Sequence, residues 1–175
     1  MPETAGARAA GRVRLVAAAL AVAVAATGCG EPAVDLDVPD RRAGQHVLDT
    51  VGLLDGTDVA AQLAALAEEG LDVVAVVYET PQAGLGEGRR AGQLVVREWE
   101  ADVALVAVAA PGDFTSGDTQ ARRRFFGLEP ADAFAVPRGL RERVAEQRAP
   151  PLAEANDWPG VFTMAIEEIA RELLP

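Results

Sequence analysis

The segment LDVVAVVY at Leu71–Tyr78 decides the fold of this chain. It is rich in β-branched residues and apolar on both faces, which is typical of a central strand that is covered on both sides. The segment ADVALVAVAA at Ala101–Ala110 has the same character. Between them, Arg89–Glu100 carries apolar residues at helical spacing, which predicts a helix with one buried side. Together these three segments predict two parallel strands joined by a right-handed helical crossover.

Further helices are predicted on both sides of this unit. Asp58–Glu69 has a helical apolar pattern and is followed by a glycine, a common residue after a helix end. Thr119–Phe126 predicts a third strand of poorer quality, and the apolar patterns of Pro137–Gln147 and Asp157–Leu174 predict two more helices. The predicted fold class is therefore α/β, a small and largely parallel sheet with helices on both faces in three layers.

The N-terminal residues 1–28 have the layout of an export signal. An arginine-rich start is followed by an apolar run at Leu15–Ala26 and by small residues directly before Cys29. The run is shorter than the roughly 20 residues that span a bilayer. Small residues followed by cysteine resemble the lipobox of bacterial lipoproteins, which implies a lipid on Cys29 and attachment to the extracytoplasmic face of the cell membrane. An uncleaved signal anchor and a secreted protein cleaved elsewhere are the alternatives.

Residues 29–44 are predicted to be the lipidated cysteine and a flexible tether, because prolines and charges alternate there without a sustained period. The folded domain is then expected over residues 45–175. A sequence of this length fits a single domain.

Charge and cysteine content exclude several classes of function. The net charge is −11, and residues 1–28 contribute +2, so the remainder carries −13. Nucleic acid is therefore not expected as a partner. An anionic leaflet would repel this domain, which leaves the lipid as the expected source of membrane attachment. The sequence has a single cysteine, so no internal disulfide and no cysteine-based zinc site is expected.

Several short motifs fail as catalytic signatures. LLDGTD at Leu53–Asp58 lacks the nucleophilic carboxylate of the DxDGT phosphatase motif, so helix capping is the preferred interpretation. The chain has one serine, Ser116, and one histidine, His46, and neither has the setting of a hydrolase triad. Pro81–Gly88 is predicted to be a glycine-rich loop. Its G-x-G-x-G spacing does not match a nucleotide-binding loop, so no nucleotide is expected.

Carboxylates are the remaining candidates for chemistry. Those next to predicted strand ends or in turns are Asp49, Asp55, Asp58, Asp113, Asp118, Glu129 and Asp132. Calcium or another divalent cation takes oxygen ligands of this type, but no EF-hand spacing is present, and caps or solvated turns are the alternative. Residues 122–124 are three successive arginines, which fit either a phosphate clamp or the solvated rim of an edge strand.

VLDTVGLLD at Val47–Asp55 contains the phrase V-x-D-x-x-G-x-L, and FFGLEPAD follows at Phe125–Asp132. The first phrase is like the one with which members of the TPM domain family start, and the second is similar to a later phrase of that family, so the domain resembles the TPM domain family. The glycine-rich insertion that usually follows the tryptophan corresponding to Trp99 is absent, and Phe125 replaces a glycine. The resemblance implies a compact, exported, membrane-associated α/β domain with an accessory role on membrane complexes. Phosphatase activity and divalent-cation binding are attributed to some members.

Carried over to this sequence, the resemblance makes Asp49, Glu129 and Asp132 the candidate metal ligands. Three functions follow as hypotheses. The first is a lipid-anchored module that binds a protein of the membrane or envelope. The second is a divalent-cation-dependent phosphomonoesterase that uses Asp49 and neighbouring carboxylates. The third is a structural spacer with neither ligand nor partner.

Overall fold

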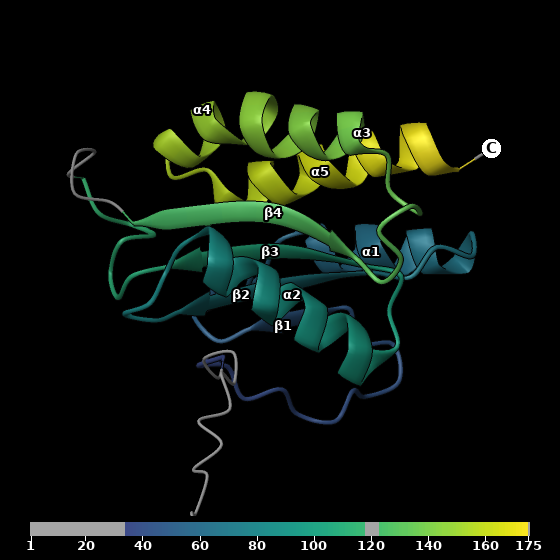
Figure 1. Cartoon of the computed structure of the whole chain (residues 1–175), viewed down its shortest axis with the longest axis horizontal. Coiled ribbons are helices and arrows are strands. Elements are labelled where there is room, and N and C mark those ends of the chain that lie inside the picture. The colour runs from purple at the N-terminus through teal and green to yellow at the C-terminus, as the bar shows by residue number, and fades with distance from the viewer. Residues whose placement is uncertain (1–33, 118–122, 175) are drawn as a thin grey trace, which may run out of the picture. The chain divides into compact units, whose positions relative to one another are not determined.

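The fold is built on a four-stranded sheet (Figure 1). A computed structural model describes residues 34–117 and 123–174. The strands, in their order across the sheet, are β1 (Val47–Asp49), β2 (Val73–Glu79), β3 (Val103–Ala109) and β4 (Arg124–Pro130). The first three are parallel, and β4 runs antiparallel to β3. The predicted α/β class with a largely parallel sheet is confirmed, whereas the export signal and Cys29 lie outside the described residues.

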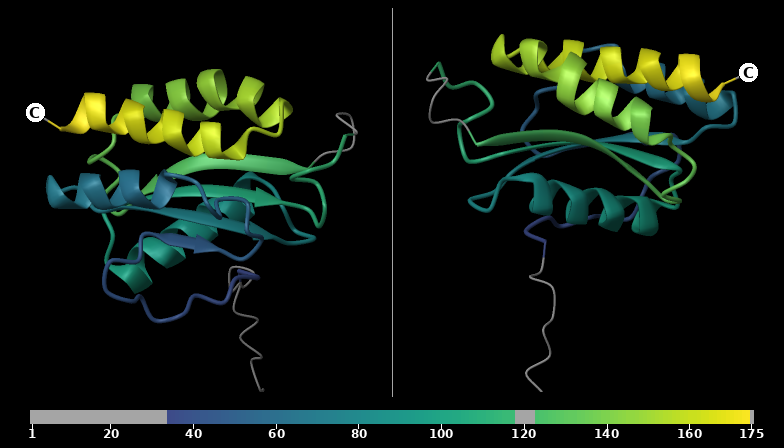
Figure 2. Two further views of the ribbon diagram at one scale, coloured as in Figure 1. Left: turned by 180° about the vertical axis from the view of Figure 1, so that it is seen from behind. Right: turned by 45° about the horizontal axis from the view of Figure 1, so that its top comes forward.

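Helices cover both faces of the sheet, as predicted (Figures 1 and 2). Among the described helices, α2 (Leu85–Trp99) covers one face, where it packs over β3 and β4 and contacts alternate residues of β2. The opposite face is covered by α1 (Val59–Glu68), α3 (Arg138–Glu142), the π-helical turn η1 (Arg143–Arg148), α4 (Ala149–Glu154) and α5 (Trp158–Leu173). The result is a three-layer arrangement with one helix below the sheet and the others above it.

The two helical crossovers have opposite handedness. In β2, Val73 and Ala75 face the layer of α1, and Val74 and Val76 face α2. Both connections advance in the same direction across parallel strands, one over each face of the sheet. Only one of them can therefore have the right-handed sense that such crossovers almost always adopt.

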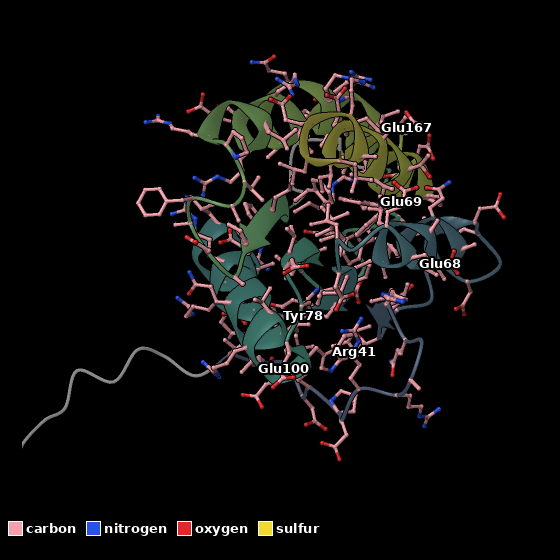
Figure 3. All side chains as sticks on the ribbon, turned by 90° about the vertical axis from the view of Figure 1, so that its right-hand side faces the viewer. Arg41, Glu68, Glu69, Tyr78, Glu100 and Glu167 are labelled. Atoms are coloured by element: carbon pink, nitrogen blue, oxygen red, sulfur yellow. The ribbon has the colours of Figure 1, made fainter. Side chains whose placement is uncertain are left out.

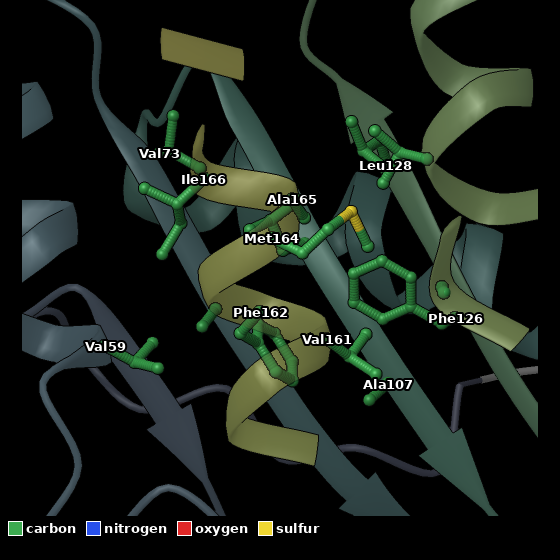
Figure 4. Packing of buried hydrophobic residues seen from close by; sticks show 14 of the residues in the cluster. Val59, Val73, Ala107, Phe126, Leu128, Val161, Phe162, Met164, Ala165 and Ile166 are labelled. Atoms are coloured by element: carbon green, nitrogen blue, oxygen red, sulfur yellow. The ribbon is translucent and has the colours of Figure 1, made fainter. Parts of the chain in front are cut away.

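The larger core lies between the sheet and α5 (Figure 4). Phe162 of α5 meets Phe126 of β4 edge to face, with ring centroids 5.3 Å apart. Trp158 packs edge-on against Phe114 at 4.8 Å, and its indole N–H donates to the Phe114 carbonyl oxygen over 3.0 Å. As predicted, α5 starts after Asp157, whose side chain accepts the N–H of Gly160.

Three element boundaries differ from the prediction. Helix α2 begins at Leu85, inside the segment expected to be a loop, and β4 extends to Pro130 instead of ending at Phe126. The helix predicted to end at Gln147 continues through η1 and α4 to Glu154. Pro150 and Pro151 stand in the first turn of α4, directly after the π-helical turn η1.

The predicted flexible tether is wrong for residues 34–44, because this segment packs on the domain. Val34, Leu36 and Val38 lie against the core on the α2 side of the sheet. The indole N–H of Trp99 donates to the carbonyl oxygen of Pro39 over 2.9 Å. Apolar residues at every second position are the signature of an extended segment with one buried side. The prediction overlooked this short alternation among the charges.

Arg41 fastens the end of this segment (Figure 3). Its guanidinium donates to both carboxylate oxygens of Asp72, to the carbonyl oxygen of Gln45 over 2.8 Å and to that of Trp99 over 3.0 Å. It also lies over the Trp99 ring, 5.6 Å from the centroid. The hydrogen bonds from Arg41 lower the pKa of Asp72. One side chain thus joins the N-terminal segment to the end of α2 and the start of β2.

Replacing Arg41 with alanine is expected to release the segment. Alanine removes the hydrogen bonds that Arg41 donates to Asp72, Gln45 and Trp99, so backbone amides of residues 34–44 should exchange hydrogen faster while those of β2 and β3 keep their protection. Hydrogen–deuterium exchange followed by mass spectrometry measures this. Arg42→Ala is the matched control, because Arg42 is exposed and its side chain makes no hydrogen bond within the described residues. Equal exchange in the two variants would contradict the role given to Arg41.

Candidate functional site

Asp49, the best-supported metal candidate in the sequence, caps a turn. It stands at the end of β1, where its carboxylate oxygens accept the backbone N–H groups of Val51, Gly52 and Leu54 over 2.9, 2.8 and 2.7 Å. These bonds shape the turn that leads toward α1. The aspartate of the V-x-D-x-x-G-x-L phrase therefore has a structural explanation in this chain, and so does Gly52, whose φ of 81° lies in the left-handed region that favours glycine.

The structure does not bring the three predicted metal ligands together. Asp49 ends β1 and Glu129 lies in β4, and these strands are the two opposite edges of the sheet. Asp132 follows β4 and accepts the N–H of Phe134 over 2.9 Å. Within residues 34–117 and 123–174, no group of three or more histidine, cysteine, aspartate or glutamate residues is arranged to hold a metal ion. Asp118 lies outside the described residues.

The lone histidine and serine are also apart. His46 precedes β1, and its Nδ1 lies 3.2 Å from an oxygen of Asp72 and 3.1 Å from Arg41. Ser116 is in the loop after β3. Since β1 and β3 are parallel, the two residues lie beyond opposite ends of the sheet. The fold therefore keeps Ser116 and His46 from forming a nucleophile–base pair.

A groove of about 750 Å³ runs beside β4 and is the candidate site. Its floor is formed by β4 from Arg124 to Glu129. One wall is the first part of α2, with Leu85 and Arg89, and the other is formed by α3, η1 and α4, including Arg141. The strand therefore lies between helices from opposite layers of the fold.

The outer edge of β4 presents unpaired backbone groups to this groove. Antiparallel pairing alternates, and Arg123 and Ala131 hydrogen-bond toward β3 through Ala110 and Asp102 over 2.9 and 2.8 Å. By this alternation Phe126 and Leu128 direct their N–H and C=O groups away from β3. Neither has another backbone hydrogen-bond partner in the described part of the chain, although Phe126 is only 8% and Leu128 only 3% exposed. Backbone N–H and C=O groups of folded proteins normally have a hydrogen-bond partner.

Glycines let α2 come close to β4. A Cβ on Gly92 would lie 2.6 Å from the Cβ of Glu129, and a Cβ on Gly88 would lie 2.1 Å from the Phe125 ring. The spacing of Gly84, Gly86 and Gly88 indicates a loop, but the structure has a helix from Leu85 onward. The informative spacing is instead that of Gly84, Gly88 and Gly92, which places the last two on the buried side of a helix.

Opposite charges meet at the Glu129 end of the groove. The Glu129 side chain is 12% exposed, with Arg89 Nε 3.8 Å away. Burial raises the pKa of Glu129, while the charges of Arg89 and Arg141 act to lower it. The Nε of Arg141 is buried without a hydrogen-bond partner in the described structure. A carboxylate with a perturbed pKa in a concave site marks a candidate for function.

Two of the three successive arginines, Arg123 and Arg124, lie in the described part of the chain, and both have hydrogen-bond partners. As predicted, Arg124 lies on an edge strand, but it is not a solvated rim residue. Its guanidinium donates to Asn156 over 2.7 Å and lies over the Trp158 ring, 5.5 Å from the centroid. Arg123 donates to the carbonyl oxygen of Pro81 over 3.2 Å, and Arg122 lies outside the described residues.

Among the groove residues, sequence reasoning found Glu129, as a candidate metal ligand, and Arg124, as part of a possible phosphate clamp. Arg89 and Arg141 are distant in sequence and look like ordinary charges on helix surfaces, so only the tertiary structure reveals them. Neither a family model nor a curated protein sequence matches this chain. In the part of the chain that the structure describes, no helix is both long and apolar enough to cross a membrane.

Proposed function

We propose that this chain is a lipid-anchored, extracytoplasmic, TPM-like module that binds a protein of the membrane or envelope in the groove beside β4. The observation that carries the proposal is that the outer N–H and C=O groups of Phe126 and Leu128, on the floor of that groove, have no backbone partner among the described residues. Proteins normally block or cover exposed strand edges. A spacer gains nothing from an open edge, whereas a binding module uses one as its docking site.

The geometry gives less support to the phosphomonoesterase. That activity needs carboxylates free to hold a cation, and Asp49 is occupied by backbone N–H groups. Asp113 is similarly engaged, since it accepts the N–H of Arg123 over 2.7 Å. Asp49 and Asp113, which end or follow parallel strands, are therefore already used as acceptors of backbone N–H groups.

The packing of residues 34–44 favours a partner close to the membrane. Only residues 30–33 separate Cys29 from the packed Val34, a stretch that spans at most about 18 Å when fully extended. Asp35 donates its N–H to Glu87 Oε1 over 3.1 Å, so the packed segment begins beside the first turn of α2. Leu85 in the same turn lines the groove and is 55% exposed. A lipid on Cys29 would thus keep this end of the groove near the bilayer.

Site-specific photo-crosslinking in intact membranes tests the proposal. A photoreactive amino acid replaces Leu85 in the groove or, as the control, Gln93, which is exposed on the same helix but does not line the groove. We expect a discrete protein adduct from position 85 and none from position 93. Equal labelling from both positions, or no protein adduct from position 85, would contradict a protein-binding groove.

A further inference from the structure

We infer that the groove receives an extended segment of the partner as an additional strand beside β4, with an acidic side chain of that segment held by Arg89 and Arg141. This inference rests on the proposed function and adds the mode of recognition and the chemistry of the ligand. It follows from the backbone of β4, the walls of the groove and the charges at its Glu129 end.

The backbone of β4 sets the mode of binding. Phe126 and Leu128 direct N–H and C=O groups into the groove, so an added strand would pair with every second residue of β4. Residues 125 and 127 already face β3 and have nothing to offer a further strand. Addition of a strand gives partners to the outer N–H and C=O groups of Phe126 and Leu128, which have no backbone partner in the described structure.

The walls of the groove favour a single strand over a second copy of the domain. Paired strands lie about 4.8 Å apart, so a partner strand must enter between α2 on one side and α3 to α4 on the other. A second copy would bring the same two walls beside its own β4. Those walls would meet the walls of the first copy before the two edges could pair. An isolated extended segment carries no such walls.

The charges at the Glu129 end of the groove determine which side chain of the ligand is favoured there. At the Glu129 end the groove contains Arg89, Arg138 and Arg141, and Arg138 pairs with Glu142. Glu129 is then the remaining carboxylate beside two arginines, one of which has a buried Nε without a partner. The other carboxylates of the groove are Glu146 on η1, whose charge acts on Arg138, and Glu154 on α4. An aspartate or glutamate of the ligand would accept hydrogen bonds from the two arginines beside Glu129.

The test uses the full chain, labelled with ¹⁵N, in detergent micelles. The probe is a blocked heptapeptide of alternating valine and threonine with glutamate at its centre. We expect the exchange of the Phe126 and Leu128 amide protons to slow about tenfold or more, because they gain hydrogen bonds, while Phe125 and Gly127 change little. A peptide with lysine at the centre should bind about tenfold more weakly.

Two variants check the side-chain assignment. Arg141→Gln should abolish the preference for glutamate over lysine, whereas Arg97→Gln should keep it, because Arg97 is exposed on α2 outside the groove. The inference is overturned if the glutamate peptide at millimolar concentration does not slow exchange at alternate residues. It is also overturned if exchange at these residues slows with protein concentration alone, which would indicate a second copy. An adduct from position 85 without this alternation would leave the proposed function intact and reject strand addition.

Discussion

Replacing Gly92 with valine is expected to destabilise the domain by about 3 kcal/mol or more. The first added carbon would lie 2.6 Å from Cβ and Cγ of Glu129 and 2.9 Å from a methyl carbon of Val106. The Glu129 Cβ is fixed to the backbone of β4, so α2 or β4 must shift. Equilibrium unfolding in urea measures the change in free energy.

Gly86→Val is the matched control. Gly86 belongs to the same helix but is exposed, and a Cβ there would meet only a mobile atom of Arg90 at 3.5 Å. We expect its effect to remain within about 0.5 kcal/mol, because valine is only slightly better than glycine in a helix and touches nothing fixed. Similar losses of stability in both variants would show that the close contact of Gly92 is not what matters.

The same substitution should impair binding in the groove. Gly92 lies close against the Glu129 side chain, and Arg89, one turn earlier in α2, lines the groove. Any displacement of α2 from β4 therefore moves one wall and one of the two arginines. Stability and recognition depend here on one close contact between a helix and a strand.

Local patterns predicted most of the fold. The continuous apolar runs at Val73–Glu79 and Val103–Ala109 identify the buried parallel strands, because side chains on both faces must be apolar. The edge strand β4 was placed too early, since its FFGLEP segment follows arginines and has no uninterrupted apolar run. Only one side of this strand is paired, so its sequence is under weaker constraint.

The site was predicted poorly for a physical reason. Resemblance selected Asp49, Glu129 and Asp132 by position, but the order of the strands places β1 and β4 at opposite edges. Convergence of side chains depends on strand order and on the face that each helix covers, and neither is encoded locally. The groove also depends on unpaired N–H and C=O groups, which every residue except proline carries. No sequence pattern distinguishes those that lack a partner.

Replacing Glu168 with glutamine is expected to cost about 2 kcal/mol at neutral pH. The Glu168 side chain is 2% exposed and joins η1 to α5. Arg143, Arg148 and Arg171 donate to its carboxylate over 3.0, 2.7 and 2.8 Å. Glutamine has nearly the same shape but no charge, so three charge-assisted hydrogen bonds are weakened. The cost stays at the lower end for a buried ion pair, because the arginines are 37%, 51% and 63% exposed and remain hydrated.

The dependence of this cost on pH identifies its cause. Hydrogen bonding from Arg171 lowers the pKa of Glu168 most, burial acts in the opposite direction, and Arg143 lowers it further. A carboxyl whose pKa is lower in the folded than in the unfolded state stabilises the fold above its unfolded pKa of about 4.3, and this stability is lost as pH falls through the folded pKa. The difference in unfolding free energy between wild type and Glu168→Gln should therefore be constant near neutrality and shrink below about pH 4. Glu167→Gln makes the same chemical change at an exposed neighbour without an ion pair in the described structure, and it should alter stability little at any pH. A difference that persists unchanged into acid would mean that Glu168 acts through its shape and not through its charge.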